Sequence, residues 1–518
     1  MTSPSSFPSP GKGVNSRGVV AAGHPLTAEA GAEVLRAGGN AVDAAVAATI
    51  ASFPLESALT GLGAGGFMML KRPGEEAVLI DFFVAAPGMG GRERSQELLP
   101  AEVRFDENTT QVFNFGAASC GVPGTAAGLA LAAERYGSMP ISDLTAAGIR
   151  WAREGAPLNQ QQAYVLSILE PIYTALPEAR ALFAPEGHIL REGELFRDPD
   201  LADALERFGD EGPDSIYAGE TAAAINEYVG VRGGILGTED LAAYEAICRK
   251  PVEVRFGDYR ILTNPPPSSG GILIGLCLAM LEGLDSTGTR DLVRAMGEAN
   301  GRRGADFVAG LEREGFVEEF LSEEALERAL GGDDRLGSTT HLSAMDSDGV
   351  CASVTCSNGT GSGLVVPGTG VHLNNMLGEE DLNPLGFHMS TPGSRVTSMM
   401  SPTIVLKGDE VVAGLGSAGS NRIRSAVLQT TVNRRAKGMS PQEAVDAARV
   451  HLEAGVLQAE PGSDEEALAA LESEGRKVFR WPEKNLYFGG VQVVTRDPAT
   501  ASLGGGGDPR RGGAVAHA

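Results

Sequence analysis

Residues 338–341, Ser-Thr-Thr-His, place a hydroxyl side chain at the start of an expected strand, directly after a charged, glycine-containing stretch at 331–337. Such a stretch is typical of an exposed, cleavable linker. If the bond between Ser338 and Thr339 were cut, Thr339 would carry a hydroxyl nucleophile and a free α-amine with a pKa of about 7.7–8.0, which could act as its base. By residue type alone a Thr-Thr pair is more often part of an ordinary strand, so only the context favours a nucleophile.

A second feature that could do chemistry is the glycine-rich turn from Gly414 to Gly419, between an expected strand at 410–414 and an expected helix at 420–435. This order matches a dinucleotide-binding turn. That alternative requires a second strand ending in an acidic residue about 20 positions further on, whereas we expect helical sequence to about Leu452. The same turn could serve as an oxyanion site, because backbone N–H groups at a helix start bind negative charge.

Other catalytic signatures are missing from the sequence. It contains no HExxH motif, no paired cysteines and no GxSxG motif, which argues against conventional zinc and α/β-hydrolase chemistry. The seven histidines would allow a Ser-His-Asp triad by number, but no sequence context supports one. We therefore expect neither a metal nor an organic cofactor.

Charge and hydropathy exclude two further classes of partner. A net charge of −25 would repel a phosphate backbone, so we expect no nucleic-acid binding. The longest apolar stretch, 270–281, is much shorter than the roughly 20 residues that span a bilayer, so we expect no membrane insertion. Residues 1–16 lack the basic start and apolar centre of a signal peptide, and we expect a disordered tail and a cytoplasmic location.

The elements around the candidate nucleophile change in type along the chain. Helices dominate to about Leu330, after a glycine loop and two buried strands near 65–81. A β-hairpin is expected from Thr339, with its turn at 346–349. Strands and helices then alternate, and the glycine-rich end from Gly504 onward is expected to be frayed.

Several longer motifs resemble those of the γ-glutamyltranspeptidases (glutathione hydrolases), in the same order and over nearly the whole chain. They are HPLTAEAGAEVLRAGGNAVDAAVAA at 24–48, PPPSSGG at 265–271, STTHLSAMDSDG at 338–349, LNN at 373–375, SMMSPTIV at 398–405, GSAGSNRI at 416–423 and DPRRGG at 508–513. The resemblance implies an α/β fold, the αββα four-layer sandwich of N-terminal nucleophile hydrolases. It also implies self-cleavage before Thr339 into a large region, 17–338, and a small region, 339–518, that together form one αββα domain.

The resemblance assigns catalytic roles to four residues. Thr339 matches the nucleophile, and Ser357 matches a threonine that hydrogen-bonds it. Serine retains the hydroxyl, so this role is preserved. Gly419 and Ser420 match a glycine pair whose backbone N–H groups form the oxyanion hole, where only the backbone is required.

The carboxylate end of the substrate site departs from the family pattern. Phe83 stands where the family has an arginine that binds the α-carboxylate of the γ-glutamyl group. Ser398 retains one of two serines that contact the same carboxylate, and Met399 replaces the other. Losing a charge-assisted bond costs on the order of 2–4 kcal/mol, so efficient glutathione turnover would require compensation by Arg395.

The amino end of the site is better preserved. Asn358 matches an asparagine that helps to bind the substrate's amino end, and Glu379 could replace the family's aspartate, with Glu380 as the alternative. We expect a self-processing amidohydrolase and acyltransferase that cleaves γ-glutamyl amides and passes the acyl group to water or an amine. The alternatives are an acylase of a different amide, of the cephalosporin or poly-γ-glutamate type, and an unprocessed non-enzymatic homologue. The two fragments are expected to remain together as a heterodimer, with further association possible.

Overall fold

A computed structural model describes residues 16–91, 97–104, 110–282, 284, 287–322 and 339–518. Residues 1–15 of the tail expected at 1–16, the expected linker at 331–337 and Ser338 lie outside these ranges. The first residue described after this last gap is Thr339.

Two antiparallel sheets form the centre of the molecule. In spatial order, the first contains β22 (Ala514–His517), β1 (Gly18–Ala22), β11 (Thr340–Asp346), β12 (Cys351–Ser357), β2 (Gly65–Lys71), β3 (Val78–Phe82) and β8 (Ile247–Arg249). The second contains β21 (Leu503–Gly507), β20 (Gly490–Arg496), β16 (Glu410–Ala418), β15 (Thr403–Lys407), β10 (Tyr259–Thr263) and β9 (Val252–Phe256).

The two sheets pack face to face, with β11 and β12 against β16. Glycines in β16 permit this close approach. A Cβ added to Gly416 would lie 2.3 Å from the His341 ring, and one added to Gly414 would lie 2.5 Å from Cys351 Sγ. Neither position has room for a side chain. The turn expected from Gly414 to Gly419 begins only at Gly419, because β16 continues to Ala418.

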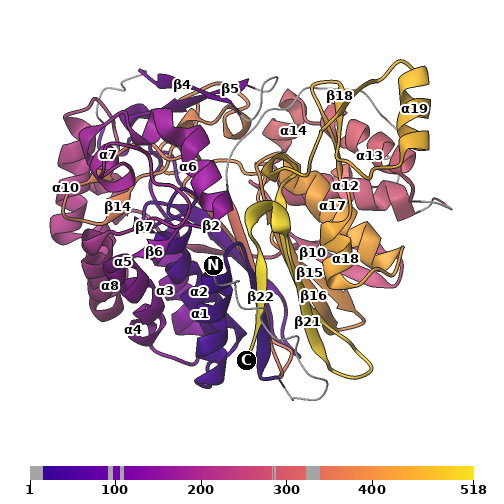
Figure 1. Cartoon of the computed structure of the whole chain (residues 1–518), viewed down its shortest axis with the longest axis horizontal. Coiled ribbons are helices and arrows are strands. Elements are labelled where there is room, and N and C mark those ends of the chain that lie inside the picture. Colours follow the sequence, from indigo (N-terminus) through magenta and orange to yellow (C-terminus); the bar gives the residue numbers. More distant parts are fainter. Residues whose placement is uncertain (1–15, 92–96, 105–109, 283, 285–286, 323–338) are drawn as a thin grey trace, which may run out of the picture.

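Helices cover the outer faces of both sheets, as Figure 1 shows. The first sheet is covered by α1 (Pro25–Arg36), α2 (Ala41–Leu55) and α3 (Thr125–Tyr136). The second is covered by α12 (Gly270–Glu282), α17 (Arg422–Arg435) and α18 (Pro441–Asp446). This arrangement confirms the expected αββα sandwich.

The remaining elements surround this core. The helices are α4 (Ile141–Leu144), α5 (Ala146–Glu154), α6 (Gln160–Tyr173), α7 (Pro177–Phe183), α8 (Pro199–Glu211), α9 (Asp214–Tyr217), α10 (Gly219–Gly230), α11 (Thr238–Ala242), α13 (Thr289–Gly301), α14 (Ala305–Gly310), α15 (Phe316–Phe320) and α19 (Glu465–Ser473). The strands are β4 (Leu99–Arg104), β5 (Thr110–Phe115), β6 (Ala156–Pro157), β7 (Leu195–Phe196), β13 (Val365–Val366), β14 (Val371–His372), β17 (Val450–Glu453), β18 (Val456–Ala459) and β19 (Lys477–Arg480).

The predicted hairpin is confirmed as β11 and β12, which pair from Thr340 with Cys356 to Met345 with Cys351. Asp346 fixes its turn, because one carboxylate oxygen accepts the backbone N–H of Val350 at 2.9 Å and the other accepts that of Ala41 at 3.0 Å. The second bond ties the turn to the first residue of α2. The hairpin is thus held at the end distant from Thr339 by a helix cap.

Two expectations for the C-terminal part are wrong. The helical sequence ends at Asp446, and β17 replaces the expected helix up to Leu452. The glycine-rich end is ordered, because β21 pairs with β20 and β22 pairs with β1. A buried ion pair links the two regions: Arg449, beside β17, pairs with Asp508 at 2.7 Å, and Asp508 follows β21 directly.

Candidate active site

Thr339 lies immediately before β11, in the middle of the first sheet, and is only 4% exposed. It borders a cavity of about 20 Å³, which has room for roughly one water molecule. The residues around the cavity are Phe83, Thr339, Ser357, Met376, Glu379, Leu382, Ser398, Met399, Met400, Ser420 and Ile423. The structure thereby brings together seven of the residues predicted from the sequence, namely Phe83, Thr339, Ser357, Glu379, Ser398, Met399 and Ser420.

Ser357 is the last residue of β12, and the hairpin returns it to the level of Thr339. Its hydroxyl accepts the backbone N–H of Gly359 at 2.8 Å, which orients the side chain at the end of its strand. The residue is fully buried. A hydroxyl can accept one bond and donate another, so Ser357 has the chemistry needed to contact a neighbouring nucleophile.

Gly419 and Ser420 form the turn between β16 and α17. Gly419 has φ +118°, and a Cβ added there would lie 2.9 Å from the Cα of Gly489. Ser420 has φ +51°, an uncommon value for serine. Its hydroxyl donates to Asp381 Oδ2 at 2.6 Å, a short charge-assisted bond that holds the turn. Asp381 could not be identified from the sequence, because its role depends on a contact with a distant turn.

Among the residues that the structure describes, Glu379 is the one carboxyl side chain around the cavity. Its pKa is raised to about 8, mainly by burial and also by the nearby Asp381, while the backbone N–H of Thr360, which donates to Oε1 at 3.1 Å, opposes the shift. At neutral pH the group is therefore mostly a neutral acid. The expected alternative, Glu380, is exposed and does not border the cavity.

Part of the cavity wall is apolar. The Phe83 ring stacks on Phe67 with ring centroids 5.3 Å apart, and Met399 is buried beside it in the wall. The Ser398 hydroxyl accepts the backbone N–H of Met400 at 3.1 Å, so it already has a partner. No Arg, Lys or His borders the cavity among the residues that the structure describes.

Arg395 does not replace the missing cation. Its Nε lies 3.4 Å from Asp81 Oδ1, and its guanidinium lies 4.4 Å from the centre of the Tyr244 ring. Asp81 also pairs with Arg249 at 2.7 Å. The guanidinium of Arg395 thus interacts with Asp81 and Tyr244, and Arg395 does not line the cavity.

Asn358 also lies outside the cavity wall, although it directly follows Ser357. Its Nδ2 donates to the carbonyl oxygen of His372 at 3.3 Å, and its side-chain oxygen has no hydrogen-bond partner in the described part of the chain. Its position supports the loop after β12. The predicted contact with a substrate would require movement of this side chain.

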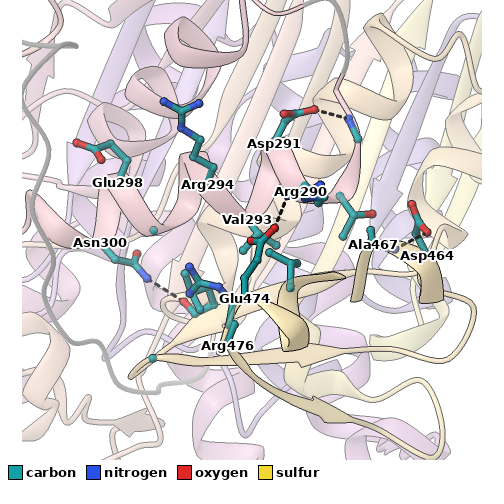
Figure 2. A pocket seen from close by; sticks show the side chains of 16 residues that line it. Arg290, Asp291, Val293, Arg294, Glu298, Asn300, Asp464, Ala467, Glu474 and Arg476 are labelled. Carbon is teal, nitrogen blue, oxygen red and sulfur yellow. Dashed lines mark hydrogen bonds and ion pairs between the residues drawn. The ribbon is translucent and has the colours of Figure 1, made fainter. Parts of the chain in front are cut away.

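A larger hollow of about 1080 Å³ lies elsewhere, between α13 and the region of β17, β18 and α19 (Figure 2). Its acidic side chains already have partners: Glu474 pairs with Arg290, and Asp464 accepts the backbone N–H of Ala467. It shares no residue with the cavity at Thr339. We therefore assign the chemistry to the smaller cavity.

One group of side chains resembles a hydrolase triad. Ser425 Oγ lies 2.8 Å from His451 Nδ1, and His451 Nε2 lies 3.7 Å from Glu453 Oε2. All three residues are buried, and none of them borders the cavity at Thr339. The Ser425 hydroxyl also donates to the carbonyl oxygen of Arg422, within α17. The group therefore links α17 to β17.

Within the described ranges, no three side chains of the metal-ligating types come together as a potential metal site. Across the same ranges, no helix has both the length and the apolar character that crossing a membrane requires.

Comparisons with known proteins find similar sequences over nearly the whole chain. The Gamma-glutamyltranspeptidase family model matches residues 27–518. The chain is 32% identical to the acylase ACY 1 proenzyme of Pseudomonas sp. strain SE83, covering 93% of this chain and 90% of that protein. It is 31% identical to the glutathione hydrolase proenzyme of Escherichia coli K12, covering 95% and 90%.

A solved structure, the cephalosporin acylase of Bacillus halodurans, superposes with a TM-score of 0.83 at 28% identity, covering 100% of this chain and 99% of the other. The match therefore includes both sheets and the helical layers. This superposition agrees with the family match and with the two relatives above 30% identity. This protein belongs to the γ-glutamyltranspeptidase family.

Proposed function

We propose that the protein is a self-processing amidohydrolase and acyltransferase in which Thr339 carries the acyl group. The observation that supports this most directly is the position of Thr339 at a buried cavity that Ser357 and Ser420 also border. A residue at the start of a chain can supply both the nucleophile and its own base. This arrangement needs no histidine, in agreement with the absence of histidine from the cavity wall among the described residues.

Activation would proceed by an acyl shift. Thr339 Oγ attacks the carbonyl carbon of Ser338, the new Oγ–C bond forms, and the C–N bond of the peptide breaks as the hydroxyl proton passes to the leaving nitrogen. Water then hydrolyses the ester, which releases the Ser338 carboxyl group and restores the Thr339 hydroxyl. The products are fragments of 338 and 518 − 338 = 180 residues.

The catalytic cycle repeats this chemistry on a substrate. Thr339 Oγ attacks the amide carbonyl, its α-amine takes the hydroxyl proton, and that proton passes to the leaving amine. The backbone N–H groups of Gly419 and Ser420 would stabilise the oxyanion at the start of α17. Water or an acceptor amine then resolves the ester, with Ser357 positioned to hydrogen-bond the nucleophile.

The cavity wall favours an acyl group without an α-carboxylate. Phe83 and Met399 replace the polar residues that the family uses, and Arg395 is held by Asp81. Burying a carboxylate that has no partner costs on the order of several kcal/mol. We therefore propose an acylase of apolar or amino-bearing acyl groups, a specificity for which the similarity to a cephalosporin acylase provides additional support.

Cleavage of γ-glutamyl amides is the second candidate. Glu379 favours it, because a buried carboxyl group at the cavity could bind the α-amino group of such a substrate. The similarity to a glutathione hydrolase points in the same direction. The two candidates differ in the acyl group and share the reaction.

Two fragments produced by cleavage would remain associated. Residues after Thr339 supply β11 and β12, which lie between β1 and β2 from the first fragment. The second fragment also supplies β15, which pairs with β10. Separation would break hydrogen-bond ladders in both sheets, so we propose a stable heterodimer. Further association, the identity of the acceptor and a cytoplasmic location remain expectations.

The first experiment compares intact masses of the wild-type protein and Thr339→Ala under denaturing conditions. We expect two fragments that meet at residues 338 and 339 in the wild type and one uncut chain in the variant. An uncut wild-type chain would instead support the non-enzymatic homologue. Matched γ-glutamyl and simple acyl anilides, assayed on the cleaved protein, would then distinguish the two substrate classes, and predominant turnover of γ-glutamyl anilide would overturn the acylase proposal.

A further inference from the structure

A buried carboxyl group lies on the face of β11 that points away from the cavity. Glu56, at the C-terminal end of α2, is 1% exposed. It accepts hydrogen bonds from Thr340 Oγ1 at 2.5 Å and from Thr27 Oγ1 at 3.0 Å. The reaction proposed above does not involve the Glu56 carboxyl group, and no sequence motif indicates a role for it.

The strand geometry connects Glu56 to the nucleophile. Successive side chains of a strand point to opposite faces of a sheet, so Thr339 borders the cavity while Thr340 points into the helical layer. Thr340 is the first residue of β11. Its bond to Glu56 therefore holds the strand end that carries Thr339, one residue after the scissile bond.

The surroundings leave this contact little freedom. A Cβ added to Gly23 would lie 2.6 Å from Glu56 Oε2 and 3.2 Å from Thr340 Oγ1, so the backbone at Gly23 closes directly over the pair. A second contact holds residue 339 itself, because Arg511 Nη1 donates to the Thr339 carbonyl oxygen at 3.3 Å. The chain is thus held at two consecutive residues.

We propose that Glu56 is a positioning residue for Thr339, acting through the Thr340 hydroxyl during self-cleavage and during turnover. The inference rests on the proposed function. Attack on the preceding carbonyl requires Thr339 Oγ to stay within reach of one carbon atom, and a misplacement of about 1 Å can cost about 10²-fold in rate. Glu56 gains or loses no proton in this role.

The test uses the full-length chain made by cell-free synthesis, with cleavage followed over time by mass. Thr340→Val removes the hydroxyl that contacts Glu56, and Thr340→Ser restores it. Thr27→Val is the matched control, because it removes the other buried hydroxyl on the same carboxyl group at a position outside the nucleophile strand. Glu56→Gln changes the acceptor itself.

We expect Thr340→Val and Glu56→Gln to slow cleavage by at least about tenfold, while Thr340→Ser and Thr27→Val stay within about twofold. In the cleaved fraction of Thr340→Val, kcat should fall with KM unchanged, because the nucleophile is displaced and the acyl site is intact. The melting temperatures of Thr340→Val and Thr27→Val should be similar, because each loses one buried hydrogen bond. A general loss of stability would therefore slow both variants alike.

Cleavage of Thr340→Val or Glu56→Gln at the wild-type rate would overturn the proposal. Equal slowing by Thr27→Val and Thr340→Val would also overturn it, because the effect would then be structural. If the proposed function itself is wrong, the wild-type chain will remain uncut, and this result distinguishes that case from a failure of the Glu56 proposal.

Discussion

Two sets of residues that border the cavity at Thr339 differ in chemical character, and we call them the nucleophile end and the acyl end after the part of the reaction proposed for each. At the nucleophile end, Thr339, Ser357 and the turn at Ser420 are polar, and a short hydrogen bond to Asp381 holds the turn. At the acyl end, Phe83 and Met399 form a packed apolar wall, with Phe83 stacked on another aromatic ring. By the resemblance noted in the sequence, we expect the first set to keep the residue types of the γ-glutamyltranspeptidases and the second to depart from them.

This difference indicates that the reaction and the choice of substrate depend on separate parts of the site. The nucleophile end requires a hydroxyl, an amine and backbone N–H groups, which any acyl group can use. The acyl end must match the polarity of one particular group, because an unpaired buried charge is strongly unfavourable. Four substitutions test this separation, in order of decreasing expected effect.

Thr339→Ala should abolish both cleavage and turnover. Removal of the nucleophile leaves no group to carry the acyl intermediate, so kcat should fall by at least about 10³-fold for every acyl donor. Intact mass and anilide hydrolysis measure the two effects. Thr339→Ser, which keeps the hydroxyl, is the control and should still cleave. Turnover by Thr339→Ala would place the nucleophile elsewhere.

Gly419→Ala should lower kcat by about 10²–10³-fold for both donor classes, because it disturbs the backbone N–H groups of the oxyanion turn. The strain comes from the positive φ of Gly419 and from the backbone of Gly489, 2.9 Å from the added Cβ. Ser420→Ala is the control, because it removes the bond to Asp381 and keeps the backbone N–H. If Ser420→Ala loses as much activity as Gly419→Ala, the side chain is the essential group.

Phe83→Arg should change the choice of substrate and retain the chemistry. A guanidinium in the wall could pair with an α-carboxylate, so the ratio of kcat/KM for γ-glutamyl anilide to that for an apolar acyl anilide should rise about 10- to 100-fold. Phe83→Leu keeps the wall apolar and should leave this ratio near the wild-type value. An unchanged ratio in a folded Phe83→Arg protein would show that this wall does not contact the acyl group.

Glu379→Gln should remove a pH dependence that is specific to amino-bearing donors. The Glu379 carboxyl group, with a pKa of about 8, is neutral at lower pH and charged at higher pH. The ratio of kcat/KM for 5-aminopentanoyl anilide to that for pentanoyl anilide should therefore rise about fivefold as the pH increases through about 8.

The ratio cancels the titration of the Thr339 α-amine, which affects both donors equally. The donor's own amine, with a pKa of about 10.4, stays charged over this range. In Glu379→Gln the ratio should be flat. A rise that persists in the variant would assign the amine contact to another group.

Several features of this protein could be predicted from local sequence. The hairpin at β11 and β12 follows from alternation on both sides of a turn, and the position of Thr339 follows from its place at the start of that hairpin. The turn at Gly419 follows from its glycines and from the helix behind it. The αββα fold was expected only through resemblance to a family, because periodicity does not determine how two sheets stack.

What local sequence could not predict are contacts between distant parts of the chain. Thr340 and Glu56 are 284 residues apart, and Ser420 and Asp381 are 39 apart. The order of the C-terminal glycines depends on Asp508, whose partner Arg449 lies beside another sheet. Arg395 could not be excluded as a substrate ligand until its ion pair with Asp81 was visible.

The amino-acid sequence by itself predicted the reaction class, because its motifs resemble those of one family and because a nucleophile that is its own base requires only one residue and a cleavable bond before it. Only the tertiary structure decided which carboxyl group borders the cavity and that Arg395 pairs with Asp81. It also decided that Glu56 contacts Thr340 at the start of β11. The physical reason is that pairing and burial depend on distance in space, and these contacts join segments that the sequence places far apart.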